Sequence, residues 1–225
     1  MPEEETSATR QPLATVVADW IRREIVSGSL KPGDRIRQEA VAKECGTSRI
    51  PVREALNRLQ DEGLITLTSH VGAKVATLDA IEFDQIYLMR ERLEPLALAQ
   101  SIPHLTPSDL QTLRNYILEM EAHADGDDPS HWVETDRKFH LASYAGAPMP
   151  YLLDLIEGFW NRTQQYRRAY TRLPERFQIA HMEHRLMMEA IERKDAVEAE
   201  QISATHIRRT RLALQEHGEL FSNEP

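Results

Sequence analysis

The sequence predicts a mainly α protein in two parts: three N-terminal helices with a small β-hairpin, then an all-α antiparallel helical bundle. Apolar residues recur at helical spacing through most of the 225 residues, and no strand signal follows residue 78. Breaks rich in Pro, Gly and Asp separate the helical segments. We expect a disordered tail at 1–11, a first domain at 12–78, a helical domain at 79–219 and a second tail at 220–225.

The first domain is expected to contain its elements in a fixed order. An apolar stripe from about Pro12 to Gly28 predicts the first helix, and residues 38–44 predict a short second helix. A third helix follows. Residues 64–68 alternate weakly between apolar and polar, residues 69–72 form a turn and residues 74–76 return, which predicts a β-hairpin wing. This order is that of a winged helix-turn-helix.

The third helix carries the residues best suited to contact DNA. Ser48 can cap its start through the side-chain hydroxyl and is also a candidate DNA contact, and Gly63 is expected to end the helix. One face is apolar, whereas Arg49, Arg53 and Asn57 recur at i, i+4 and i+8 on another stripe. Because Arg can bind guanine and Asn can bind adenine in the major groove, this stripe predicts a recognition helix. A solvated helix face is the alternative.

Two further residues are candidate DNA contacts. Arg35 lies in the turn before the second helix, where a guanidinium can bind a phosphate. A surface salt bridge would explain Arg35 equally well. His70 lies in the turn of the expected hairpin, where it could approach the minor groove or remain a solvated turn residue.

The charge distribution fits a DNA contact confined to the first domain. The whole chain has a net charge of −9, but residues 10–78 hold 11 Lys and Arg against 8 Asp and Glu. A single cysteine, Cys45, excludes an internal disulfide and fits a reducing cytoplasm. No apolar run is long enough to cross a bilayer and no signal peptide is evident, so we expect a cytoplasmic protein without membrane contact.

The second domain is predicted to consist of six helices. Asp79 and Glu82 have the spacing of a capping box at the start of the first of them. The six helices are expected at about 80–101, 107–124, 130–145, 151–171, 176–192 and 196–217.

Four residues of this domain form a candidate metal site. Asp136 and His140 are four residues apart and share a helix face, although an ordinary surface pair would have the same spacing. His184 and His206 lie at similar distances on either side of the expected turn at 194–195, so an antiparallel helix pair places them level. If all four face inward, they suit a divalent transition metal ion: zinc first, with nickel, manganese or iron as alternatives.

Four such ligands leave coordination positions open on a six-coordinate ion, where a small carboxylate could bind. Arg90 on the first helix of the domain and Arg162 on the fourth are candidate effector-binding residues, although each could also be a surface residue. The same ligand set is compatible with a metalloenzyme or with a sensor of the metal itself. We favour a binding protein over an enzyme because no general base is evident beside the site.

These motifs together resemble the GntR family of transcription factors, FadR subfamily. The first domain resembles the family's winged helix through Leu30–Arg35, Ser48–Leu56 and Leu59–Ile65. The second resembles the family's all-helical FCD-type ligand domain through Arg90-x-x-Leu93-Glu94, Asp136-x-x-Phe139-His140, His184-Arg185 and His206. The wing departs from many relatives, because Val71 stands where a basic residue often precedes the glycine.

The resemblance implies a homodimer in which Arg35, Arg49 and Arg53 contact double-stranded operator DNA. It also implies that the four candidate ligands hold a metal ion, with the carboxylate of a small organic-acid effector near it. We therefore expect a ligand-responsive transcriptional regulator, with repression relieved by the effector as the expected response.

Overall fold

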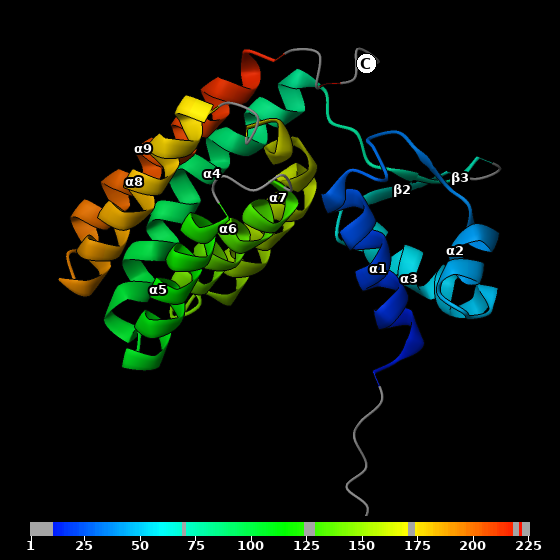
Figure 1. Cartoon of the computed structure of the whole chain (residues 1–225), viewed down its shortest axis with the longest axis horizontal. Helices are drawn as coiled ribbons and strands as arrows, with labels where there is room; N and C mark the ends of the chain where they lie inside the picture. Colours follow the sequence, from blue (N-terminus) through cyan, green and yellow to red (C-terminus); the bar gives the residue numbers. More distant parts are fainter. Residues whose placement is uncertain (1–10, 69–70, 124–128, 171–173, 218–220, 222–225) are drawn as a thin grey trace, which may run out of the picture. The chain divides into compact units, whose positions relative to one another are not determined.

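The computed structural model describes residues 11–68, 71–123, 129–170, 174–217 and 221 (Figure 1). The chain divides into two compact units, residues 1–76 and 77–225. Helices dominate both units and the small sheet lies in the first, so the predicted fold class is confirmed. His70 lies outside the described residues, as do the predicted tails apart from Gln11 and Phe221.

The first unit combines three helices with a three-stranded antiparallel sheet. The hairpin was predicted, but a third strand, β1, pairs with β3 at its other edge, in the order β1-β3-β2. Because β1 has only two residues, the sequence shows no alternation there that could predict it. The elements are α1 (Leu13–Ser27), β1 (Arg35–Ile36), α2 (Gln38–Glu44), α3 (Arg49–Asp61), β2 (Ile65–Thr68) and β3 (Gly72–Val75).

Helix α3 begins and ends close to the predicted residues. Ser48 is the N-cap residue, but its hydroxyl makes no capping hydrogen bond, so the predicted capping role of that side chain is wrong. At the other end Gly63 adopts a left-handed conformation with φ of 75°. The amide of Leu64 donates to the carbonyl of Leu59 at 2.9 Å, which closes the last turn in a Schellman arrangement.

The core of the first unit fixes which face of α3 is exposed. Four residues of α3 are completely buried and pack against α1 and α2, in a cluster that also includes residues of the sheet. Their burial supplies most of the stabilisation that a short helix needs. The buried residues of α3 are Val52, Ala55, Leu56 and Leu59.

The second unit is built from six long helices and one short 3-10 turn in its described part. Capping boxes start two of the helices, at Asp79 with Glu82 and at Thr106 with Asp109. None of the described helices is both long enough and apolar enough to cross a membrane. The elements are α4 (Ala80–Ser101), η1 (Ile102–His104), α5 (Pro107–Ala122), α6 (Pro129–Tyr144), α7 (Pro150–Tyr170), α8 (Pro174–Glu192) and α9 (Ala196–Gln215).

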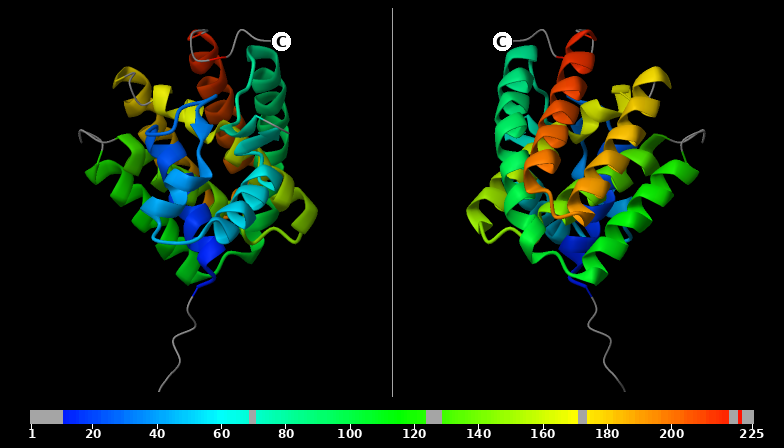
Figure 2. Two further views of the ribbon diagram at one scale, coloured as in Figure 1. Left: turned by 90° about the vertical axis from the view of Figure 1, so that its right-hand side faces the viewer. Right: turned by 90° about the vertical axis from the view of Figure 1, so that its left-hand side faces the viewer.

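The helices of the second unit enclose one apolar core. Helix α4 packs along α9, and α9 packs against its sequence neighbour α8 (Figures 1 and 2). Lys194 has a positive φ of 57° in the tight turn between α8 and α9. This short turn makes α8 and α9 antiparallel neighbours, so that residues equally far from it come level.

Candidate metal centre and DNA-contact surface

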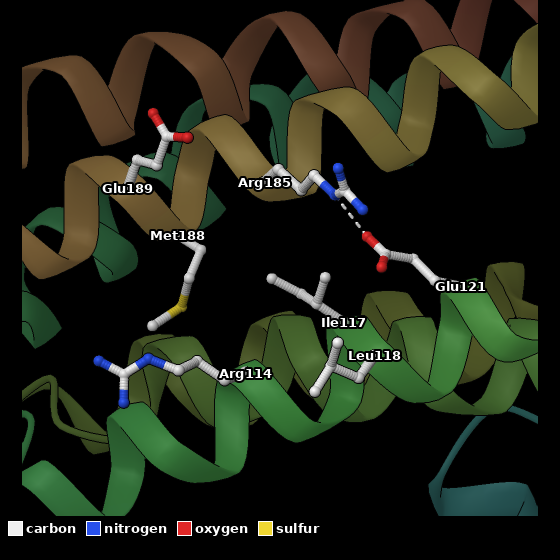
Figure 3. Close-up of a pocket in the computed structure, with 7 residues that line it drawn as sticks. All are labelled: Arg114, Ile117, Leu118, Glu121, Arg185, Met188 and Glu189. Atoms are coloured by element: carbon white, nitrogen blue, oxygen red, sulfur yellow. Dashed lines mark hydrogen bonds and ion pairs between the residues drawn. The ribbon is translucent and has the colours of Figure 1, made fainter.

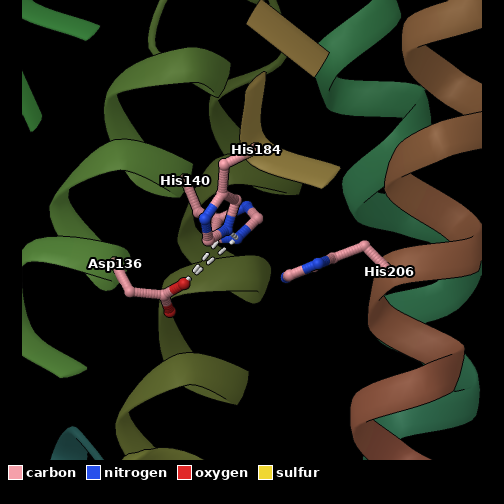
Figure 4. Close-up of side chains that lie close together, drawn as sticks. All are labelled: Asp136, His140, His184 and His206. Atoms are coloured by element: carbon pink, nitrogen blue, oxygen red, sulfur yellow. Dashed lines mark hydrogen bonds and ion pairs between the residues drawn. The ribbon is translucent and has the colours of Figure 1, made fainter. Parts of the chain in front are cut away.

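The structure brings the four candidate metal ligands together inside the second unit. Asp136 and His140 project from α6, His184 from α8 and His206 from α9, and all four are buried. One potential ligand atom of each lies within 4.8 Å of the other three. The Nε2 atom of His184 lies 3.2 Å from His140 Nε2 and 3.2 Å from Asp136 Oδ1. Figure 4 shows His206 facing the other three side chains from α9.

The hydrogen bonds around the cluster determine which nitrogen of two imidazoles carries the proton. His206 Nδ1 lies 3.0 Å from a carboxylate oxygen of Glu183, which can only accept, so Nδ1 donates. His140 Nδ1 lies 3.1 Å from the hydroxyl of Tyr144, which itself donates to Glu94 at 2.8 Å. His140 Nδ1 must therefore donate as well. In both imidazoles Nε2 keeps a lone pair, which is the form that binds a metal ion.

Burial keeps the three imidazoles neutral. It lowers the pKa of His184 and of His206 to about 4 each, although Asp136 opposes the shift, and it lowers the pKa of His140 well below its ordinary value. Burial is the largest influence on Asp136 and disfavours its charged form, but the Arg167 guanidinium 2.5 Å away, together with His184 and His140, outweighs it and holds the pKa of the carboxyl well below its usual range. At neutral pH the cluster therefore has the protonation state that metal binding requires.

The cluster fits a divalent transition metal ion. The Nε2 atom of His206 is buried and has no hydrogen-bond partner among the described residues. An unpaired buried nitrogen costs free energy unless a ligand binds it. One carboxylate oxygen and three imidazole nitrogens form a ligand set for zinc, nickel, manganese or iron. Glu183 and Tyr144 are hydrogen-bond partners of the kind that orient metal-bound histidines.

Arg90 is completely buried next to the cluster. It donates to Glu94 and, at 3.0 Å, to Thr163, so it reaches the cluster through the Glu94–Tyr144 hydrogen bond. Its guanidinium lies 4.2 Å from the ring of Trp160. One nitrogen of Arg90, Nη2, has no hydrogen-bond partner among the described residues. This nitrogen is a buried donor that an anionic ligand could use.

Arg162, the other candidate effector-binding residue, is half-buried on α7 and shows no contact with the cluster among the described residues. Arg167 on the same helix contacts Asp136 instead and lies 4.6 Å from the ring of Trp160. Arg167 was not among the residues predicted from the sequence, although its position in the sequence carries a signal. Arg167 continues the buried stripe of α7 at i, i+4, i+7 and i+11, which Arg162 does not. The stripe consists of Ile156, Trp160, Thr163 and Arg167.

A groove of about 350 Å³ lies between α5 and α8 and includes none of the cluster residues (Figure 3). Arg185 on its rim pairs with Glu121 at 2.5 Å, and Arg114 pairs with Glu192 at 2.6 Å. Both rim arginines are therefore already neutralised by glutamates, and the groove is less suited to an anion than the buried cluster. The lining residues are Arg114, Ile117, Leu118, Glu121, Arg185, Met188 and Glu189.

The candidate DNA-contact residues of the first unit are exposed. Arg49, Arg53, Asn57 and Ser48 all lie on the exposed surface at or near α3. Arg49 lies 3.3 Å from Glu39, but both side chains are largely exposed, and such a pair contributes little to stability. Breaking this pair would leave Arg49 available to another partner at little cost.

Arg35 has a structural contact that the sequence analysis did not predict. Its Nε atom donates to the backbone carbonyl of Val71 at 2.9 Å, and a terminal nitrogen donates to the same oxygen. Arg35 therefore ties strand β1 to the turn between β2 and β3 while its side chain remains exposed. A phosphate contact is compatible with this position and would place the wing next to the same phosphate.

Comparisons with known proteins identify the two units. Residues 13–75 match the family described as bacterial regulatory proteins, gntR family, and residues 85–209 match the FCD domain. The chain is 31% identical to the HTH-type transcriptional regulator McbR of Escherichia coli (strain K12) over 150 residues, which cover 67% of this chain and 68% of McbR. A solved structure of E. coli McbR/YncC has a TM-score of 0.82 and 25% identity, covering 92% of this chain and 98% of that one.

Two further relatives share most of their length with this chain. The uncharacterised HTH-type transcriptional regulator YdhC of Bacillus subtilis (strain 168) is 28% identical over 187 residues, which cover 83% of this chain and 84% of YdhC. The HTH-type transcriptional repressor GlaR of E. coli (strain K12) is 23% identical over 197 residues, covering 84% and 89%. The chain therefore belongs to the gntR family of bacterial regulatory proteins and is a transcriptional regulator with an FCD domain, not an enzyme.

Proposed function

We propose that this protein is a cytoplasmic, homodimeric repressor of the FadR subfamily whose FCD domain binds a divalent metal ion and a small organic acid. The observation that carries the proposal is the convergence of four buried ligand atoms within 4.8 Å, with the lone pairs of His140 Nε2 and His206 Nε2 facing inward. The similarity to GlaR, a relative named as a transcriptional repressor, supports the direction of regulation.

The first unit would bind the operator through α3. Arg49, Arg53 and Asn57 would face the major groove, where guanidinium and amide groups bind base edges bidentately. Two copies related by a two-fold axis would present two such helices to the half-sites of a pseudo-palindrome. Arg35 would bind the phosphate backbone, which positions the protein without reading sequence.

The second unit would recognise the effector by charge. Asp136, His140, His184 and His206 would hold the metal ion, zinc first among the candidates. The ion would supply a Lewis-acidic position for a carboxylate oxygen of the effector. Arg90 would donate from its unpaired Nη2 atom to the same ligand, held in place by Glu94 and by the Trp160 ring. Arg162 remains a candidate for a contact farther from the metal.

The effector would change DNA affinity by favouring one arrangement of the two first units in the dimer. A ligand can shift such an equilibrium only by the difference between its affinities for the two arrangements. The helices that carry the cluster and Arg90 would couple effector binding to this change, because a ligand held near His140 would act on α6 and its contact with Arg90 would act on α4.

A thermal-shift screen of small organic acids tests the effector proposal. An acid that binds only the folded state at about 100 times its Kd should stabilise the protein by about 2.7 kcal/mol and raise the Tm accordingly. The shift should disappear when a chelator removes the metal, and the amide of the same acid should give none.

The matched control for this screen is the Arg114→Ala/Arg185→Ala variant, which removes both arginines of the α5–α8 groove. It should keep the full shift if the acid binds at the metal. A shift that survives the chelator but is lost in this variant would place the acid in the groove and would contradict the proposal.

A further inference from the structure

Ile50 is a large apolar side chain at the start of α3, among the candidate DNA-contact residues. It is 71% exposed, whereas its neighbours on the exposed surface include Arg49, Arg53 and Asn57. Single exposed apolar side chains are common on protein surfaces, so exposure alone gives Ile50 no role. Its position on the helix is more informative.

Helical geometry places Ile50 opposite the buried face of α3. Successive residues are rotated by about 100°, so the buried Val52 and Leu59 lie roughly 160° and 180° around the helix from Ile50. Asn57 lies only roughly 20° from Ile50 and Arg53 roughly 60° from it. Ile50, Asn57 and Asp61 therefore lie on the ridge of α3 that is farthest from the core, with Glu54 on one side of it and Arg53 on the other. A helix that enters a groove with its core behind it inserts this ridge first.

The major groove offers one apolar group at the edges of its unmodified bases, the C5-methyl of thymine. The side chain of Ile50 has no donor or acceptor, so it cannot pair with any other group on a base edge. Its removal from water is favourable only against an apolar partner. As a β-branched residue it also has few rotamers, so little conformational entropy is lost when it is fixed.

We propose that Ile50 contacts the C5-methyl of a thymine in each half-site, next to the base contacted by Asn57 or Arg53, and so helps to determine operator specificity. The inference rests on the proposed insertion of α3 into the major groove. It adds an apolar contact to a helix surface whose other candidate DNA contacts are arginine side chains and the amide of Asn57.

Removal of single methyl groups from the DNA tests this contact. The preferred duplex is first selected from a random-sequence library with the wild-type protein. Each thymine is then replaced singly by deoxyuridine, which lacks only the C5-methyl, and Kd is measured by fluorescence anisotropy at a fixed salt concentration. One thymine in each half-site should become sensitive, its replacement weakening wild-type binding about fourfold, the value of one buried methyl.

The Ile50→Ala variant supplies the second half of the test. It should bind the selected duplex more weakly than wild type and should show no further loss when the sensitive thymine is replaced. Because Ile50 is exposed, the variant should keep its fold, which circular dichroism checks. Leu118→Ala, which changes another exposed apolar residue in the FCD domain, should reproduce the wild-type profile.

Two results would overturn the inference, and they differ in what else they affect. Identical deoxyuridine profiles for wild type and Ile50→Ala would remove Ile50 from base recognition and leave the proposed function intact. Failure of the library to yield any preferred sequence would contradict the docking of α3 itself, and the Ile50 contact with it.

Discussion

The His184→Ala/His206→Ala variant is expected to purify without stoichiometric metal, whereas the wild-type protein should carry one ion per chain. Half of the four ligands are lost, and the remaining Asp136 and His140 come from one helix and cannot enclose an ion. Because metal that binds only the folded state stabilises it, the variant should also melt at a lower temperature than the wild type. Elemental analysis of the purified proteins measures the metal directly.

Two controls separate loss of the metal site from loss of the fold. His123→Ala/His131→Ala removes two histidines outside the cluster and should keep the full metal content. His206→Gln keeps most of the buried volume while it changes the ligand, and it should reduce metal content with a normal circular dichroism spectrum. Full occupancy in the His184→Ala/His206→Ala variant would remove both residues from the ligand set.

Arg49→Ala and Arg53→Ala are each expected to weaken binding to the selected duplex by about 1–3 kcal/mol and to relax specificity at one position per half-site. The reason is the loss of a bidentate contact with a base edge. Fluorescence anisotropy titrations against the selected duplex and against a scrambled duplex of equal length measure both effects at one salt concentration.

Arg58→Ala is the matched control, because Arg58 lies on the same helix and carries the same charge. Arg58 is held by Glu62 at 3.1 Å and lies on the opposite side of the Ile50–Asn57 ridge from Arg53, away from the arginine stripe. Its loss should weaken binding to both duplexes by a similar, smaller factor. Equal effects of Arg49→Ala and Arg58→Ala on the two duplexes would show that Arg49 contributes only charge.

Most elements of the fold could be predicted because they have a local cause. Capping residues such as Asp79 and Thr106 start helices, and Gly63 closes α3, wherever tertiary packing places them. Strand β1 could not be predicted, because two residues form a strand only when β3 is already in place beside them. For Ser48 the predicted position is correct but the predicted contact is wrong, since the residue is at the N-cap but its hydroxyl makes no capping hydrogen bond.

The candidate metal ligands could be selected from the sequence because two spacings along the chain indicate which side chains come together. The spacing of four puts Asp136 and His140 on one face of α6, and the short turn before α9 brings His184 and His206 level. Their hydrogen-bond partners depend on how the helices are rotated against each other. Glu183 and Arg167 lie on buried stripes of α8 and α7, and a charged residue within an apolar stripe is a sequence signal for such a partner.

The central claim is that a metal-bound acid in the FCD domain controls the affinity of the first unit for DNA. The most direct measurement is a titration of the metal-loaded protein with the selected duplex, with and without an acid identified by thermal shift, and again after chelation. We expect the acid to change the Kd for DNA several-fold with metal present and not at all after chelation. An unchanged Kd with the acid bound, or an equal change without metal, would contradict the account.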